Sequence, residues 1–122
     1  MINVFVYGTL KTGYSRNYIL EEHSPGIPCV TVQKFQMKRA GYPFIKPEPK
    51  GFPVVGELYE VSDETLKILD QIEGYPHLFK HLKIHVDSKD GMIEALVYVK
   101  GDWEEPDYFI EVQPENGVLE YI

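Results

Sequence analysis

Glu73 has the residue type and the setting of a general acid or base. It follows Leu66 by seven positions and Leu69 by four, so helical spacing places it on the row that faces the core or at its rim. It also falls in the last turn of the predicted helix, where the macrodipole disfavours an acidic side chain by roughly 0.3–1 kcal/mol. Burial and the dipole both favour the protonated form, so we expect a raised pKa suited to proton transfer. The alternative is a frayed, solvent-exposed helix end.

The second candidate is a short turn after the first predicted strand, made of Tyr7, Gly8, Thr9 and Leu10. A glycine beside a hydroxyl residue at a strand end can aim successive backbone N–H groups into one concavity. Such a concavity binds a carboxylate or stabilises an oxyanion, because the N–H dipoles converge on the negative charge. The alternative is an ordinary turn that ends a strand.

The elements that would position these residues are mostly strands. Alternation and turn signals predict strands over residues 2–7, from 30 toward 37, and over 53–61, 82–86 and 92–99. Asp90 and Gly91 join the last two strands as a hairpin. Residues 40–53, rich in proline and glycine, are expected to form a long loop or a sheet edge, and Gly56 marks a bulge or a close backbone approach.

Two helices are predicted between the strands. A short one begins at about Ser15, runs to Glu22 and ends before Pro25, whereas a clearer one is capped by Ser62 and stopped by Gly74. Strands outnumber helices and no βαβ alternation is present. The pattern therefore indicates an α+β fold around a curled, mostly antiparallel or mixed sheet.

Composition limits the class of protein. The 122 residues, 43% of them hydrophobic, can bury one core, so we expect a single domain over residues 1–122. The formal net charge of −7 repels a polyphosphate backbone, which disfavours nucleic acid as a partner. No apolar run approaches the roughly 20 residues of a membrane span. No signal peptide is evident, and the lone Cys29 suits a reducing compartment and apolar packing. These features predict a soluble, cytoplasmic protein and specify no oligomeric state.

Three histidines, His77, His81 and His85, recur every four residues and would share a face of a helix. Pro76 and the following alternation indicate a strand instead, in which four residues span about 13 Å, too far for two side chains to share a zinc ion. We expect solvated strand histidines and no metal site. Trp103 is expected in the core or at its rim, and residues 104–107 are expected to form a solvated acidic loop.

Several short segments together resemble the γ-glutamylcyclotransferase-like family, particularly its γ-glutamylamine branch. They are, in chain order, Val6-Tyr7-Gly8-Thr9-Leu10-Lys11 with Gly13, Gly41-Tyr42-Pro43, Gly56-Glu57-Leu58-Tyr59-Glu60-Val61, Leu66 and Leu69-Asp70-Gln71-Ile72-Glu73-Gly74 with Pro76, and Ala95-Leu96-Val97-Tyr98-Val99. The segments span most of the chain. The resemblance implies a small mixed, mostly antiparallel β-barrel with short flanking helices, acting without cofactor or metal.

The resemblance also implies a reaction. The α-amine of a γ-glutamyl compound attacks its own γ-carbonyl, closing 5-oxoproline and expelling the amine. In this family the matching glutamate carries the proton and the turn holds the γ-glutamyl group, roles that fall to Glu73 and to Tyr7, Gly8, Thr9 and Leu10. We expect a ligand carboxylate against the backbone N–H groups of residues 8–10, because no arginine cluster is visible nearby.

The chain departs from the family pattern after Glu73. Family members often carry Tyr and Arg there, where this chain has Leu78-Phe79-Lys80-His81. Whether Phe79 and His81 alter activity is open, as is the substrate, which could be a γ-glutamyl amine, a γ-glutamyl amino acid or a carrier-bound group. Asn17 stands one position out of step and is left outside the site. The alternative function is a catalytically silent small-molecule-binding module on the same fold.

Overall fold

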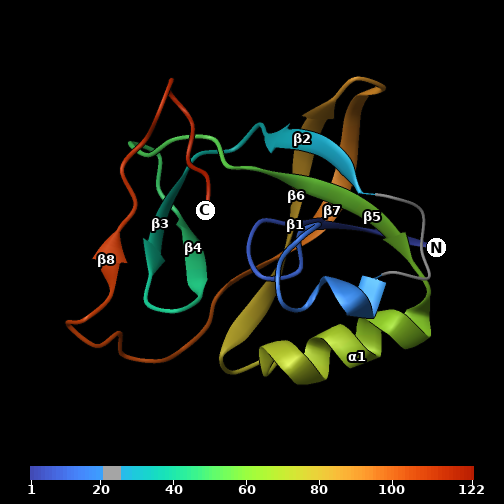
Figure 1. The fold of residues 1–122 in the computed structure, drawn as a ribbon, viewed down its shortest axis with the longest axis horizontal. Coiled ribbons are helices and arrows are strands. Elements are labelled where there is room, and N and C mark those ends of the chain that lie inside the picture. The colour runs from blue at the N-terminus through green and yellow to red at the C-terminus, as the bar shows by residue number, and fades with distance from the viewer. Residues whose placement is uncertain (21–25) are drawn as a thin grey trace.

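The computed structural model describes residues 1–20 and 26–122, which are mostly strands. In chain order the elements are β1 (Ile2–Val6), the 3-10 helix η1 (Asn17–Leu20), β2 (Ile27–Thr31), β3 (Phe35–Arg39), β4 (Pro43–Pro47), β5 (Val55–Val61), α1 (Asp63–Glu73), β6 (Phe79–Ser88), β7 (Gly91–Lys100) and β8 (Ile110–Glu111). Figure 1 shows a three-stranded sheet beside a barrel, with α1 running along the lower side of the barrel.

Five strands form a closed barrel in the order β1-β5-β2-β6-β7. All neighbours are antiparallel except β1 and β7, which pair in parallel at Val4 and Leu96 and so close the ring. Closure leaves no unpaired edge in this sheet. The predicted α+β fold with a mixed, mostly antiparallel barrel is confirmed, as is the β6–β7 hairpin at Asp90-Gly91.

The second sheet has the order β4-β3-β8 and receives the chain directly from the barrel. The single strand expected from residue 30 toward 37 is therefore two strands in different sheets. The break follows Thr31, whose hydroxyl donates to the Gln33 carbonyl (2.7 Å) and accepts from the Val54 N–H (2.9 Å), so the chain turns there. Within the segment expected to be a loop or a sheet edge, residues 43–47 form the edge strand β4.

The helix α1 has the predicted bounds and caps. Ser62 accepts a hydrogen bond from the Thr65 N–H (3.2 Å) at its start, and Gly74 adopts the left-handed conformation (φ 65°, ψ 33°) at its end. The shorter helix differs, because only η1 forms, and the predicted end at Glu22 and Pro25 lies outside the described residues. Leu20 of η1 and Leu69 of α1 belong to one buried cluster, so the two helices pack together (Figure 1).

The barrel interior is filled by apolar side chains, among them Cys29, which is 7% exposed, as its apolar packing predicts. A Cβ atom on Gly56 would lie 2.3 Å from the Val6 carbonyl oxygen, which confirms the close backbone approach expected there. Among the described helices, none is long and apolar enough to cross a lipid bilayer.

Candidate functional site

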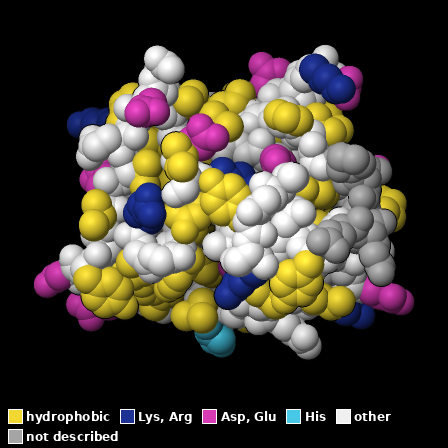
Figure 2. Space-filling model, viewed as in Figure 1, with side chains coloured by type: hydrophobic (Ala, Val, Ile, Leu, Met, Phe, Trp, Pro, Cys, Tyr) yellow, Lys and Arg dark blue, Asp and Glu magenta, His cyan; other side chains and the backbone are white. Residues whose placement is uncertain are grey.

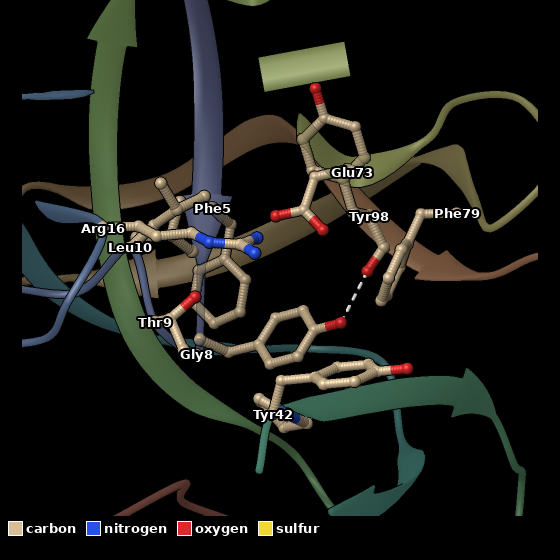
Figure 3. A pocket seen from close by; sticks show the side chains of 12 residues that line it. Phe5, Gly8, Thr9, Leu10, Arg16, Tyr42, Glu73, Phe79 and Tyr98 are labelled. Atoms are coloured by element: carbon tan, nitrogen blue, oxygen red, sulfur yellow. Dashed lines mark hydrogen bonds between the residues drawn. The ribbon is translucent and has the colours of Figure 1, made fainter. Parts of the chain in front are cut away.

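A pocket lies where the end of β1, the last turn of α1 and the β3–β4 turn meet against β7. Its inner part, about 40 Å³, is lined by Tyr7, Gly8, Thr9 and Leu10, by Glu73, and by Phe5, Val6, Arg16, Tyr42, Pro43, Phe79 and Tyr98. Figure 3 shows most of these side chains around one space. Two segments more than sixty positions apart in the sequence are thereby brought together, as the sequence predicts.

Glu73, the last residue of α1, directs its carboxylate into the inner pocket (Figure 3). Burial raises the pKa of this carboxyl above its usual value, and the positive charge of Arg16 offsets part of the rise. The expected inward position and the direction of the pKa shift are both found. Burial dominates the shift because the barrel wall replaces water around the carboxylate.

The turn after β1 uses its carbonyl groups and leaves its N–H groups open. The Gly8 carbonyl accepts from the Lys11 N–H (3.1 Å), the Thr9 carbonyl from the Arg16 N–H (2.8 Å) and the Leu10 carbonyl from the Asn17 side chain (2.9 Å). Within residues 1–20 and 26–122, no hydrogen-bond acceptor is found for the N–H groups of residues 8–10. Three donors therefore remain available beside the pocket.

Gly8 allows this turn to pack closely against β4. A Cβ atom at Gly8 would lie 2.7 Å from the Pro43 side chain, so any larger residue would push the turn away from the pocket wall. Tyr7 fixes the other side, because its buried hydroxyl donates to the Tyr98 carbonyl on β7 (2.8 Å). Burial and then the charge of Glu73 raise the pKa of Tyr7, which therefore remains a neutral hydrogen-bond donor.

Arg16 is a charged pocket residue that sequence reasoning missed. The loop of residues 11–16 folds back on the turn, and Figure 3 shows the guanidinium entering the pocket opposite the Glu73 carboxylate. Among the described side chains, no ion pair within 4.0 Å joins the two groups. The only indication of it in the sequence is a single arginine seven positions after Thr9. The sequence shows no arginine cluster near the turn, and the pocket lining contains one arginine, which the closure of this loop brings there.

A polar cluster behind the pocket attaches α1 to the barrel. Asp70, one turn before Glu73, accepts from the Tyr98 hydroxyl (2.6 Å) and pairs with the His81 ring (2.7 Å). The His81 ring stacks on Tyr75 at 3.9 Å between centroids. The prediction of solvated strand histidines is therefore wrong for His81, whose side chain is 23% exposed. We call Asp70, His81 and Tyr98 the anchoring cluster.

An outer cleft of about 400 Å³ continues from the inner pocket and shares with it Arg16, Tyr42, Glu73 and Phe79. Its remaining walls come from Ile72 and Leu78 and from the β7–β8 connection, which contributes Trp103, Glu104, Pro106, Tyr108 and Phe109. On the face seen in Figure 2, hydrophobic side chains gather at the lower left, over this connection. Trp103 is thus both a core neighbour, as predicted, and part of the cleft wall.

The β7–β8 connection is held by an ion-paired carboxylate. Glu105 pairs with Lys38 and with Lys46 (3.4 Å), and the hydrogen bond from Lys38 is the main cause that lowers the pKa of Glu105. The predicted solvated acidic loop is therefore wrong at Glu105, because two strands of the second sheet supply cations. Among the described residues, no group of three His, Cys, Asp or Glu side chains is placed to hold a metal ion.

Comparison with known proteins identifies the family of this chain. The family model described as "Gamma-glutamyl cyclotransferase, AIG2-like" matches residues 4–116. A gamma-glutamylaminecyclotransferase of Mus musculus is 35% identical over 95 residues, which cover 70% of this chain and 64% of that protein. The chain therefore spans less than two thirds of the length of that relative.

Two further similarities extend the comparison. The gamma-L-glutamyl-butirosin B gamma-glutamyl cyclotransferase of Niallia circulans is 32% identical over 106 residues, covering 81% of this chain and 67% of that protein. The crystal structure of an AIG2-like protein from Mus musculus superposes with a TM-score of 0.75 at 28% identity, covering 85% of this chain and 80% of that one. This chain therefore belongs to the AIG2-like gamma-glutamyl cyclotransferase family.

Proposed function

We propose that this chain converts a γ-glutamyl amide into 5-oxoproline and a free amine. The observation that carries the proposal is one pocket in which the half-buried Glu73 carboxylate lies opposite Arg16 and beside the open N–H groups of residues 8–10. The names of the two relatives give them γ-glutamyl amines and γ-L-glutamyl-butirosin B as substrates.

The donors of the pocket suit the head group of a γ-glutamyl substrate, which carries an ammonium and a carboxylate on one carbon. The inner pocket is narrow and admits such a head rather than a whole substrate. We place the ammonium toward Glu73 and the carboxylate toward Arg16 and the turn. The N–H groups not used by the carboxylate are available to the oxyanion that forms on the γ-carbonyl.

The nucleophile is the α-amine of the substrate itself, so the main chemical task of the protein is to transfer protons. At neutral pH the α-nitrogen is an ammonium, so Glu73 must first accept a proton before the nitrogen can attack. Attack forms a new C–N bond, and the original amide C–N bond then breaks. Two protons pass in total from the α-nitrogen to the departing nitrogen, which leaves as an ammonium ion. A raised carboxyl pKa brings Glu73 closer to the pH at which it must both accept and donate.

Because the two reacting groups are already joined, the protein does not have to bring separate reactants together. The amine and the carbonyl belong to one molecule, so holding the folded conformer converts binding energy directly into rate. We assign Tyr7 to the pocket wall, where its bond to the Tyr98 carbonyl keeps the turn in place. Gly8 lets the turn approach the substrate, and Thr9 and Leu10 supply backbone donors.

The test is release of 5-oxoproline from a panel of γ-glutamyl amines, γ-glutamyl amino acids and γ-glutamyl-butirosin-like amides. Glu73→Gln is expected to lose about 10²–10⁴ in kcat while still binding ligand, because Gln keeps the shape but cannot accept a proton. The matched control is Glu64→Gln on the exposed first turn of the same helix, which should retain parental activity. A Glu73→Gln protein with most of the parental rate would remove Glu73 from the mechanism. Ligand binding without any 5-oxoproline would identify a silent binding module.

A further inference from the structure

The outer cleft lies where the departing half of a γ-glutamyl amide would extend. It adjoins the inner pocket through four shared residues, Glu73 and Arg16 among them, and its volume is about 400 Å³ against about 40 Å³ inside. If the head group occupies the inner pocket, the substituent on the amide nitrogen must enter the outer cleft. The residues that line this cleft would therefore contact the departing amine and determine which amines are accepted.

The walls of the cleft are aromatic and already fixed. Trp103 and Phe109 lie 5.8 Å apart between ring centroids, and both pack on the fully buried Phe44 at 5.4 and 5.1 Å. The Trp103 indole N–H donates to the Leu78 carbonyl (2.7 Å) and is not available to a ligand. Tyr42 meets Phe109 edge-to-face at 5.7 Å. These rings form a pre-ordered apolar surface whose spacing suits a further aromatic ring.

The charges of the cleft disfavour a second carboxylate on the ligand. Among the described residues that line it, Glu73 and Glu104 are acidic and Arg16 is the one cation, which the proposed function engages with the carboxylate of the γ-glutamyl head. Lys100 lies over the Trp103 ring, but its ammonium donates to the carbonyls of Gly101 and Trp103 and it is not among the lining residues. A leaving group with its own carboxylate would thus lie beside the negative charge of Glu104 without a counter-charge.

We propose that the outer cleft selects an aromatic amine that carries no carboxylate as the leaving group. This inference rests on the proposed function for the position of the head group, and it narrows the substrate from γ-glutamyl compounds in general to γ-glutamyl arylalkylamides.

Three matched substrates separate the contributions of ring and charge. γ-Glutamyl-phenethylamide and γ-glutamyl-phenylalanine differ only in the carboxylate, and γ-glutamyl-ethylamide lacks only the ring. We expect kcat/KM for the phenethylamide to exceed each of the others by at least about tenfold, because the ethylamide buries no ring and the phenylalanine compound leaves a charge unpaired. Equal values, or a preference for the phenylalanine compound, would overturn the inference.

A charge reversal at the rim tests the part played by Glu104. Glu104→Lys should raise kcat/KM for γ-glutamyl-phenylalanine relative to the phenethylamide by about tenfold, because it supplies the missing counter-charge. Glu104 is exposed, so the change leaves the fold intact. The control is Glu115→Lys, an exposed acid that lines neither pocket and gives the same change of net charge. An unchanged ratio in Glu104→Lys, or the same change in both variants, would contradict the electrostatic argument.

Binding to the cleft can be measured without turnover, because Trp103 is the single tryptophan of the chain. N-acetyl-phenethylamine should change its fluorescence and saturate, whereas N-acetyl-phenylalanine should bind at least about tenfold more weakly. Absence of 5-oxoproline from every substrate would refute the proposed function and leave this comparison standing. Equal binding of the two amides, or no fluorescence change with either, would refute the inference even in an active cyclotransferase.

Discussion

The Glu73 carboxylate lies in a setting that favours its neutral form, and this has a thermodynamic cost at neutral pH. Burial raises its pKa in the folded protein, so the folded state binds this proton more tightly than the unfolded chain does. The folded protein therefore loses stability as pH rises from the unfolded pKa, about 4.3, toward the folded pKa, and loses no more above it.

Replacing Glu73 by Gln should therefore stabilise the protein while removing its activity. We expect the melting temperature of Glu73→Gln to equal that of the parent near about pH 4, and to exceed it at pH 7 by a few degrees. Thermal melts across this range measure the effect, with Glu64→Gln as the control for loss of one charge from the same helix. A gap between Glu73→Gln and the parent that is constant with pH would mean that ionisation of Glu73 is not its cause.

Arg16 shifts the pKa of Glu73 in the direction opposite to that of burial. Its positive charge lowers the pKa of Glu73, so Arg16→Gln should move the acid limb of the kcat–pH profile to higher pH. The KM for a γ-glutamyl substrate should rise as well, because the head-group carboxylate loses its cation. Arg39→Gln, which changes an arginine outside the pocket, serves as the control. An acid limb that stays in place would show that the two groups do not interact across the pocket.

The sequence was sufficient for the residues of the site that carry a local signature. Glu73 could be found from helical phase, and the turn at Gly8 from a strand that ends in a glycine. Arg16 could not, because its position depends on the Thr9 carbonyl accepting the Arg16 N–H and folding the loop back. Tyr98 was equally hidden, since in a strand it is indistinguishable from any other aromatic core residue. Side chains delivered by loop closure or tertiary pairing leave no periodic pattern.

At the scale of elements, the orientation of α1 is set by its polar attachment as well as by its apolar face. Asp70 receives hydrogen bonds from two strands through the Tyr98 hydroxyl and the His81 ring, one turn before Glu73. The anchoring cluster therefore determines where the end of the helix lies over the pocket. In this chain the attachment uses an imidazole, whose ring also stacks on Tyr75.

Asp70→Asn should affect catalysis by displacing Glu73 rather than by removing a reacting group. We expect kcat to fall about tenfold with little change in KM, because a shift of the helix end misplaces the proton carrier but not the head-group donors. Stability should fall by about 1–3 kcal/mol as the Tyr98 hydroxyl and His81 lose their charged partner.

The control for this change is Asp63→Asn in the exposed first turn of the same helix. A positioning role predicts that the acid limb of Asp70→Asn moves together with kcat, because the surroundings of Glu73 change. A loss of stability with unchanged kcat and pH profile would assign the anchoring cluster to folding alone.

Most elements were predictable because their local signals agree with the fold. The caps at Ser62 and Gly74 set the bounds of α1, and the Asp90-Gly91 turn set the β6–β7 hairpin. Because of their prolines, residues 43–47 could be placed only in a loop or at a sheet edge, and they form the edge strand β4, where a missing N–H costs little. The error lies between β2 and β3, where tertiary partners override local propensity. The split between β2 and β3 depends on a side-chain bond between Thr31 and Val54 that no local pattern encodes.

At the scale of the whole molecule, closure of the barrel was implied only by family resemblance. Alternation specifies that a segment is a strand with one buried face, but not which strand pairs with which. The parallel contact between β1 and β7 joins segments near opposite ends of the described chain, and only the packed interior selects it. The second sheet likewise requires the short strand β8, whose two residues carry no recognisable strand signal.

The parallel pairing of β1 with β7, which closes the barrel and is called the seam here, also bears on the order in which the elements fold. The β6–β7 hairpin closes over a two-residue turn, whereas the pairing of β1 with β7 must bring Val4 to Leu96 and bears the loop-closure entropy of most of the chain. The hydrogen bond from Tyr7 to the Tyr98 carbonyl crosses the same seam. We therefore expect the pocket to be completed late in folding, because a chain with its hairpins formed but β1 and β7 unpaired has no site for a ligand. Ligand present during folding then stabilises only the closed barrel, and it slows unfolding rather than accelerating the early steps.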